Sequence, residues 1–359
     1  MAFKLLYIED QHAESRAQDL MNSGFEVVTY DPSSDIRDVL AQISDDTSAL
    51  VLDYRLTAGE KNACFDAPTI AQTLRSKHSH DANKRPEMPI VLMSNESVIT
   101  DYYNDFTSQD LFDFTLTKKE FIEAQTRFAV KLNAFINGYK RIKNSGFDIL
   151  QVLGIGSDEA LLVHPNIKIK ATKFDHHVFE YSRLVFEQII RSIGPLVGED
   201  ILSARLGVSK ESAGWPQLLE TLTNAKYKGI LSDAYSRWWM TKVNDWWSIF
   251  IKAEVPLRRL DAEERVELLT KRLGLDLIPL QKTEYSQSSN FWTICKLSNQ
   301  PIDPFDGIEL YKKDPLPWQE KEYLSIDTAM NHIDKFKNYI SAIDRKAIRE
   351  LSQKINSKK

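Results

Sequence analysis

The chain has 359 residues, which is too long for one ordinary compact domain and indicates two. Its formal charge of −5, without clustered Lys and Arg, argues against nucleic acid and acidic membranes as partners, because basic clusters neutralise phosphate groups. Two separated cysteines, Cys64 and Cys295, argue against a disulfide framework or structural zinc and favour a reducing, cytoplasmic setting. Neither a signal peptide nor an apolar run of about 18 residues is present, so we expect no membrane association.

Short apolar runs alternate with amphipathic helical patterns over the first part of the chain. The predicted strands are 5–8, 25–28, 49–52, 89–93 and 112–116. The predicted helices are 11–22, 35–43, 68–77, a less regular one after the fourth strand, and 120–139. Because the central strands are apolar throughout, this alternation predicts an α/β domain with a five-stranded, doubly wound parallel sheet covered on both faces.

The remaining residues predict a different, mainly α-helical domain. We expect one domain over 1–140, a linker over 141–150 and a helical domain over 151–359. The predicted helices of the last region are 178–193, 199–206, 217–222, 232–253, 261–273 and 326–355, with one lone strand at 291–297. The first domain has enough core to be expected to fold alone.

Polar side chains stand at the ends of four predicted strands. Glu9 and Asp10 end the first, Asp53 the third, Ser94 the fourth and Lys118 the fifth. Because the carboxyl ends of parallel strands meet at one edge of a sheet, these side chains are expected to lie together. Three crowded carboxylates repel one another unless a divalent cation lies among them, and such oxygen ligands suit Mg²⁺.

This constellation resembles the receiver domain of two-component response regulators, a flavodoxin-like fold, over the whole of residues 1–140. The resemblance implies that Asp53 accepts a phosphoryl group from a histidine kinase. It also implies a Mg²⁺ site formed by Glu9, Asp10, Asp53 and the backbone carbonyl of Arg55. Ser94 and Lys118 would bind the phosphoryl oxygens. The chemistry is coherent, because attack of a carboxylate on phosphorus requires neutralised equatorial oxygens.

Three positions depart from the receiver pattern. Asn95 follows Ser94, where receivers have a small residue that leaves room for the phosphodonor. Lys119 stands where a proline usually follows the lysine. Thr115 occupies the position of the aromatic switch, so the output face is expected to signal differently.

The loops around the acceptor are long and charged. Inserted segments at 57–67 and 78–87 are expected to be solvated, including His78 and His80. In a receiver, the positions of Arg55 and Glu96 flank the path of water to the phosphoryl group, so the resemblance implies that a pair between them slows hydrolysis of the phosphoaspartate. The competing interpretation is that Arg55 turns to solvent.

The last region offers weaker patterns. One stripe of residues at helical spacing is expected to pack in the core, and it consists of Tyr235, Trp239, Val243, Trp246 and Phe250. Trp238 and Trp247 lie nearer the flanks of this stripe, where we expect a surface for a partner or ligand. Residues 201–209 resemble the first helix and turn of a helix-turn-helix. Gly214 and Pro216 interrupt the would-be recognition helix, which also lacks a basic face.

The chain as a whole is similar in character to the receiver component of Detocs-like antiphage phosphorelays. We therefore expect a non-enzymatic phosphorelay switch or phosphate sink, which assists only its own phosphorylation and dephosphorylation. Its expected partners are a histidine kinase and an effector protein, with homodimerisation left open. One alternative is a receiver-gated enzyme with an acidic or His-bearing pocket in the last region. The other is a DNA-binding regulator, which an exposed basic helix near Arg205 would support.

Overall fold

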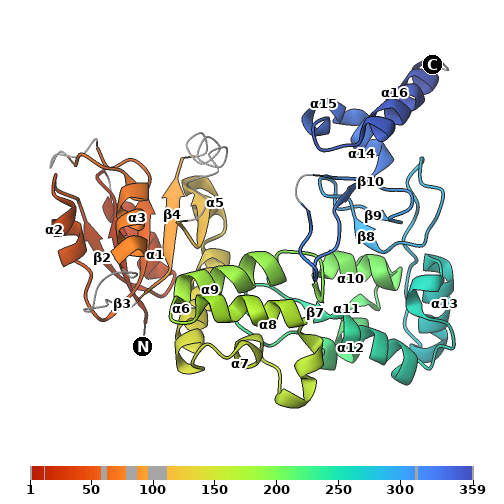
Figure 1. Ribbon diagram of the computed structural model, residues 1–359, viewed down its shortest axis with the longest axis horizontal. Helices are drawn as coiled ribbons and strands as arrows, with labels where there is room; N and C mark the ends of the chain where they lie inside the picture. Colours follow the sequence, from red (N-terminus) through yellow and green to blue (C-terminus); the bar gives the residue numbers. More distant parts are fainter. Residues whose placement is uncertain are drawn as a thin grey trace. The chain divides into compact units, whose positions relative to one another are not determined.

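The computed structural model describes residues 2–11, 13–57, 63–77, 87–95, 111–311 and 314–357. The chain forms two compact units (Figure 1). The first comprises Met1–Gly156, Ile169–Phe186 and Gly229–Ala234, and the second comprises Ser157–Lys168, Glu187–Lys228 and Tyr235–Lys359. Within the described residues no helix has the length and apolar character needed to cross a bilayer.

The first unit is built on a five-stranded sheet. Its strands are β1 (Lys4–Ile8), β2 (Glu26–Tyr30), β3 (Thr47–Asp53), β4 (Ile90–Ser94) and β5 (Phe114–Thr117). They lie in the order β2-β1-β3-β4-β5, and every neighbouring pair is parallel. This strand order is that of the flavodoxin-like fold. The predicted fold class is therefore confirmed for this unit, and all five strands lie where the sequence indicated.

Residues alternate between the two faces of this sheet. One core contains Leu6 and Ile8 of β1 with Leu50 and Leu52 of β3, packed together with residues of two helices that cover this face. Because successive side chains of a strand point to opposite faces, Tyr7 belongs to the other face. The helices of this unit that flank the sheet in sequence are α1 (Ala13–Asn22), α2 (Ile36–Ala41), α3 (Ala67–Lys77), α5 (Lys118–Glu123) and α6 (Gln125–Asn144).

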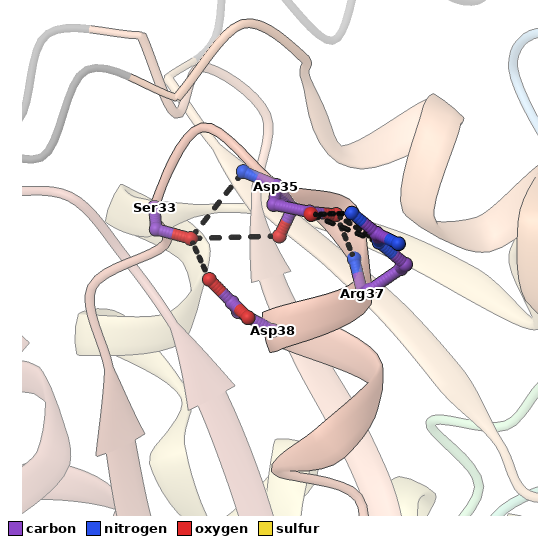
Figure 2. Close-up of polar contacts among 4 residues, drawn as sticks. All are labelled: Ser33, Asp35, Arg37 and Asp38. Carbon is purple, nitrogen blue, oxygen red and sulfur yellow. Dashed lines mark hydrogen bonds and ion pairs between the residues drawn. The ribbon is translucent and has the colours of Figure 1, made fainter.

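The loop that leads from β2 into α2 is fixed by its own polar side chains (Figure 2). The Asp35 carboxylate accepts a hydrogen bond from the backbone N–H of Arg37 at 2.8 Å and pairs with its guanidinium at 2.6 Å. The Ser33 hydroxyl donates to Asp38 at 2.6 Å. The Asp35 carboxylate thus caps an N–H of the first turn that lacks an intrahelical partner, and the Ser33 contact ties the loop to the same turn. Together they stabilise a helix too short to persist alone.

The single helix predicted over 120–139 is wrong in its bounds. The structure has two helices, α5 and α6, separated at Ala124, whose φ of −142° is not helical. The first begins early because Thr117 and Glu120 form a capping box, in which the Thr117 hydroxyl accepts from the Glu120 N–H at 3.0 Å and the Glu120 carboxylate accepts from the Thr117 N–H at 2.7 Å. Such reciprocal bonds satisfy two otherwise unpaired donors. They place Lys118 on the first turn of α5.

A buried ion pair holds the amino edge of the sheet. Arg75 of α3 contacts Asp113, which precedes β5, at 3.0 Å, and both side chains are almost wholly buried. Asp113 also accepts from the Ile90 N–H at 2.8 Å and from the Tyr139 hydroxyl at 2.6 Å. The guanidinium of Arg75 lies 3.6 Å from the ring centroid of Phe179, in α9 (Val178–Val185). This network joins α3, β5, α6 and α9 in one unit.

The first unit continues beyond the boundary predicted at residue 140. α6 runs unbroken to Asn144, and α7 (Ile149–Leu153) begins inside the predicted linker. The Tyr181 hydroxyl donates to the Phe147 carbonyl at 2.7 Å, and the rings of Phe135 and Phe186 lie 5.1 Å apart, edge to face. The chain around α9 is thus part of the same core as the sheet. The predicted boundaries themselves stay predictions.

The second unit is mainly helical, as predicted. Its helices are α10 (Glu199–Leu206), α11 (Trp215–Thr221), α12 (Met240–Asp245), α13 (Ala262–Leu273), α14 (Ile326–Asn331), α15 (Ile333–Phe336) and α16 (Ala342–Asn356), and α8 (Pro165–Ala171) lies where the chain passes back to the first unit. Its strands form three antiparallel pairs, β6 (Leu196–Val197) with β7 (Trp238–Trp239), β8 (Thr293–Ile294) with β9 (Pro301–Ile302), and β10 (Ile308–Glu309) with β11 (Tyr323–Leu324).

Two predicted elements of this unit are wrong. The helix expected over 232–253 is a short strand followed by α12 and a π-helical turn, because the backbone of Trp238 and Trp239 pairs with β6. The helix expected over 326–355 is three helices. The surface expected at Trp238 and Trp247 is also absent, because their side chains are only 3% and 2% exposed. Tertiary packing overrides the helical spacing of these tryptophans.

We predict that fragment 1–186 is more stable than fragment 1–140. The shorter fragment lacks the rings of Phe179 and Phe186, and burial of two such rings contributes roughly 2–5 kcal/mol. Urea unfolding of both fragments measures the difference. Phe179→Ala in fragment 1–186 serves as the control and is expected to remove part of the gain. Equal unfolding free energies of the two fragments would show that α9 is not part of the receiver-like core.

Candidate functional site

Three carboxylates meet at the carboxyl edge of the sheet. Glu9 and Asp10 follow β1, and Asp53 ends β3. One carboxylate oxygen of each lies within 4.8 Å of the other two. Glu9 and Asp53 are buried, with 3% and 8% of their surfaces exposed, whereas Asp10 is half-buried. The strand order therefore gathers the acidic residues that the sequence predicted to lie together.

Lys118 joins two of these carboxylates. Its ammonium group donates a hydrogen bond to Oε2 of Glu9 at 2.8 Å and lies 3.1 Å from Oδ1 of Asp53. The contact with Asp53 is an ion pair that lacks hydrogen-bond alignment. The lysine is brought here by β5 and by the capping box at the start of α5. Lys118 thus links the carboxylate that follows β1 to the one that ends β3.

Ser94 stands at the end of the neighbouring strand. Asp53 pairs in register with Met93, so Ser94 lies one residue further along β4, and its side chain is buried. Asn95, which follows it, is exposed. The phosphoryl-binding roles inferred for Ser94 and Lys118 stay predictions, and so do the metal-binding roles of the acidic residues.

Two hydrogen bonds join the residues after Asp53 to the start of α3. The Leu56 N–H donates to the Asp66 carboxylate at 3.2 Å, and the Ala67 N–H donates to the Tyr54 carbonyl at 3.1 Å. Arg55 between them has an exposed side chain. Its predicted partner Glu96 lies outside the described residues, as do His78 and His80.

Burial and charge crowding set the electrostatics of Asp53. Burial and, after it, the nearby Glu9 carboxylate raise its pKa to about 6, and Lys118 opposes both effects. Oδ1 of Asp53 is buried and lies 3.1 Å from the Lys118 ammonium group without hydrogen-bond alignment. Three carboxylates gathered in this way form a set of hard oxygen ligands suited to Mg²⁺. The residues present therefore fit the metal that the sequence predicted.

Sequence reasoning missed one member of the site. The Tyr7 hydroxyl donates to Oε2 of Glu9 at 2.8 Å, and the Tyr7 side chain is fully buried in β1. Burial, followed by the charge of Glu9, raises the pKa of Tyr7 well above its usual value, so the phenol stays a donor. The sequence signal for Tyr7 was an aromatic residue among the apolar residues of the first strand. It stands two positions before Glu9, so the two side chains lie on the same face of the sheet.

The solved structures similar to this chain include receiver domains, each matched over a third or somewhat more of its length. The receiver domain of a CheY-like response regulator from Methylobacillus flagellatus is 22% identical, with 33% of this chain and 87% of that chain covered and a TM-score of 0.24. A response regulator receiver domain from Clostridium thermocellum is 18% identical, with 39% and 98% covered and a TM-score of 0.29. The response regulator TrrA from Thermotoga maritima, in complex with Mg²⁺ and BeF, is 18% identical, with 36% and 96% covered and a TM-score of 0.27.

No family model and no curated protein matches the chain. At these identities and TM-scores, the fold assignment rests on the strand order, and the interpretation of the site rests on its geometry.

We predict that Asp53→Asn stabilises the metal-free protein at neutral pH. The folded protein holds the Asp53 proton up to about pH 6, whereas the ordinary carboxyl pKa is 3.8. The ionised side chain is therefore disfavoured in the folded state, and its removal is expected to add roughly 1–3 kcal/mol above pH 6. The gain should shrink as the pH falls below about 6 and vanish below about 4, where both states are protonated. Urea unfolding across this range, in the presence of a chelator, is the measurement; a constant gain at every pH would contradict the assigned cause.

Proposed function

We propose that this protein is a phosphorelay response regulator in which Asp53 accepts a phosphoryl group from the phosphohistidine of a histidine kinase. One observation carries the proposal: the buried Asp53 carboxylate lies beside two further carboxylates and 3.1 Å from the Lys118 ammonium group, at the carboxyl edge of the sheet. An oxygen of Asp53 forms the new bond to phosphorus. The bond from phosphorus to the imidazole nitrogen breaks, and its electron pair stays on the imidazole.

The surrounding residues have separate roles in this proposal. Glu9, Asp10, Asp53 and the backbone carbonyl of Arg55 hold Mg²⁺, which supplies positive charge to the phosphoryl oxygens when bound. Lys118 leaves its contacts with the carboxylates and pairs with the phosphoryl charge. Ser94 donates a hydrogen bond to a phosphoryl oxygen. Geometry supports this assignment for the three acidic side chains and Lys118, which lie together at the carboxyl edge of the sheet.

The output is proposed to act through protein contacts, as a phosphate sink or a switch. Position 115 carries threonine, so the usual aromatic switch is missing. The neighbouring Phe114 does not replace it, because its ring is buried, 5.2 Å from Phe135 and with Lys131 4.0 Å from its centroid. The proposed setting is an antiphage phosphorelay, which the resemblance of the whole chain supports.

Neither alternative gains a supporting feature from the described residues. A DNA-binding surface was expected to expose a basic helix near Arg205, but that side chain is 1% exposed and pairs with Glu320 at 2.8 Å. A receiver-gated enzyme was expected to have an acidic or His-bearing pocket in the last region. Within the parts of the chain that the structure describes, the acidic edge of the sheet is the one cluster of three or more His, Cys, Asp or Glu ligands.

We predict that acetyl phosphate and Mg²⁺ label Asp53. Wild type should gain one phosphoryl group that hydroxylamine removes, and Asp53→Asn should gain none, because an amide cannot form the acyl phosphate. Intact-mass spectrometry followed by peptide mapping is the measurement. Asp35→Asn is the matched control, since Asp35 is an exposed carboxylate in a loop that follows β2 at the same edge. Undiminished labelling of Asp53→Asn would refute the acceptor assignment.

We also predict that the phosphoaspartate hydrolyses slowly. Asn95 narrows the entrance to the acceptor, and a pair between Arg55 and Glu96 would exclude water from the line of attack. Arg55→Ala, Glu96→Ala and Asn95→Ala should each shorten the half-time of the phosphorylated form, which loss of the hydroxylamine-labile mass follows. If the Arg55 and Glu96 variants lose the phosphoryl group no faster than wild type, Arg55 serves no gate and its exposed side chain is only solvated.

A further inference from the structure

One oxygen of Glu9 accepts two hydrogen bonds from different directions. The Tyr7 hydroxyl and the Lys118 ammonium group both donate to Oε2, each at 2.8 Å. The bond from Tyr7 is buried, and the bond from Lys118 is partly buried. Glu9 itself is 3% exposed, so water supplies little alternative hydrogen bonding. These two donors therefore set the position of the Glu9 carboxylate.

The two donors differ in how freely they can leave. Lys118 sits on the first turn of α5, is partly exposed, and also faces Asp53 at 3.1 Å. A flexible ammonium group of this kind follows the strongest nearby negative charge, and a phosphoryl group on Asp53 is such a charge. Tyr7 is held inside β1 with no exposed surface. When Lys118 turns to a phosphoryl group, Tyr7 is the donor that remains.

We infer that Tyr7 is a positioning residue, whose hydroxyl holds the Glu9 carboxylate in place for a divalent cation independently of Lys118. The inference rests on the proposed Mg²⁺-dependent phosphoacceptor function. Glutamate has more rotatable bonds than aspartate, so a glutamate at this position loses more side-chain entropy when it binds a metal. A fixed donor from the same strand reduces that loss. Groups that hydrogen-bond to metal ligands commonly affect metal affinity for this reason.

The alternative is that Tyr7 only fills space in the core. Tyr7→Phe separates these two roles, because it keeps the ring and removes the hydroxyl. If the hydroxyl positions Glu9, Lys118 becomes the one remaining donor to Oε2 among those described, and its ion pair with Glu9 competes with the cation. The dissociation constant for Mg²⁺ is then expected to rise by about 3- to 30-fold.

The chain supplies a matched control at the other end of the sheet. The Tyr139 hydroxyl donates to Oδ1 of Asp113 at 2.6 Å, and this bond is also buried. Tyr139→Phe therefore removes a comparable hydrogen bond to a buried carboxylate of the same unit, at its amino edge. It is expected to lower stability while leaving the dissociation constant for Mg²⁺ within about twofold of wild type.

The experiment is a calorimetric titration of Mg²⁺ into the full chain for wild type, Tyr7→Phe and Tyr139→Phe, with thermal unfolding recorded for each. Weaker binding in Tyr7→Phe alone supports the inference. Equal binding in Tyr7→Phe and wild type overturns it, while the proposed function stands. Equal weakening in both variants also overturns it, since general destabilisation then explains the effect.

A second pair of variants, Glu9→Gln and Glu9→Gln with Tyr7→Phe, tests whether the Tyr7 hydroxyl acts through Glu9. Glu9→Gln removes the charge that Tyr7 holds, so adding Tyr7→Phe to it should weaken Mg²⁺ binding by less than about twofold further. A loss as large as that of Tyr7→Phe alone would show that the hydroxyl acts through some other group. Absence of Mg²⁺ binding in wild type would refute the proposed function, and with it this inference.

Discussion

The crowding of three carboxylates at the end of a parallel sheet is the constraint on which the site depends. Among the described residues, the Lys118 ammonium group contacts two of these carboxylates. Burial and, after it, the neighbouring Glu9 carboxylate disfavour the ionised form of Asp53 and raise its pKa to about 6. The same crowding gathers carboxylate oxygens of the kind that bind divalent cations. The crowding that destabilises the ionised folded protein therefore also assembles the candidate metal site.

The opposite edge of the sheet shows what a purely structural carboxylate requires. Asp113 accepts hydrogen bonds from Arg75, from the Ile90 N–H and from the Tyr139 hydroxyl, so both of its oxygens have donors. Oδ1 of Asp53 lies 3.1 Å from the Lys118 ammonium group without hydrogen-bond alignment. Two buried carboxylates of one unit therefore differ in their donors and in their neighbours. Asp113 holds helices and strands together, whereas Asp53 lies beside two further carboxylates.

Buried arginines have the structural role in the second unit. Arg265 has no exposed surface and donates to the carbonyls of Leu257, Phe291 and Arg205 at 3.0, 2.8 and 3.1 Å. Arg205 pairs with Glu320 and lies 4.7 Å from the ring centroid of Trp292. These side chains hold short helices and two-stranded sheets that have few backbone bonds of their own. Arg205, a candidate binding residue in the sequence, is thus part of the core.

The sequence by itself determined the α/β part of the fold and the side chains at its carboxyl edge. Apolar runs of strand length between amphipathic helices allow few topologies, and parallel strands bring Glu9, Asp53 and Lys118 to one edge whatever the details of packing. Helical spacing of side chains gave a wrong prediction where the backbone forms a strand pair instead of a helix. Trp238 and Trp239 have helical spacing with later residues, but their backbone pairs with β6, which no local pattern predicts.

Only the tertiary structure decided which of these polar groups form hydrogen bonds and ion pairs with one another. The hydrogen bond from Tyr7 to Glu9 follows from strand alternation, but its distance depends on how β1 packs against its neighbours. The extension of the first unit to α9 depends on Phe179 lying over Arg75, a contact between residues more than a hundred positions apart in the sequence. Long-range contacts of this kind depend on burial and geometry in three dimensions, whereas the sequence pattern records only the preferences of each segment.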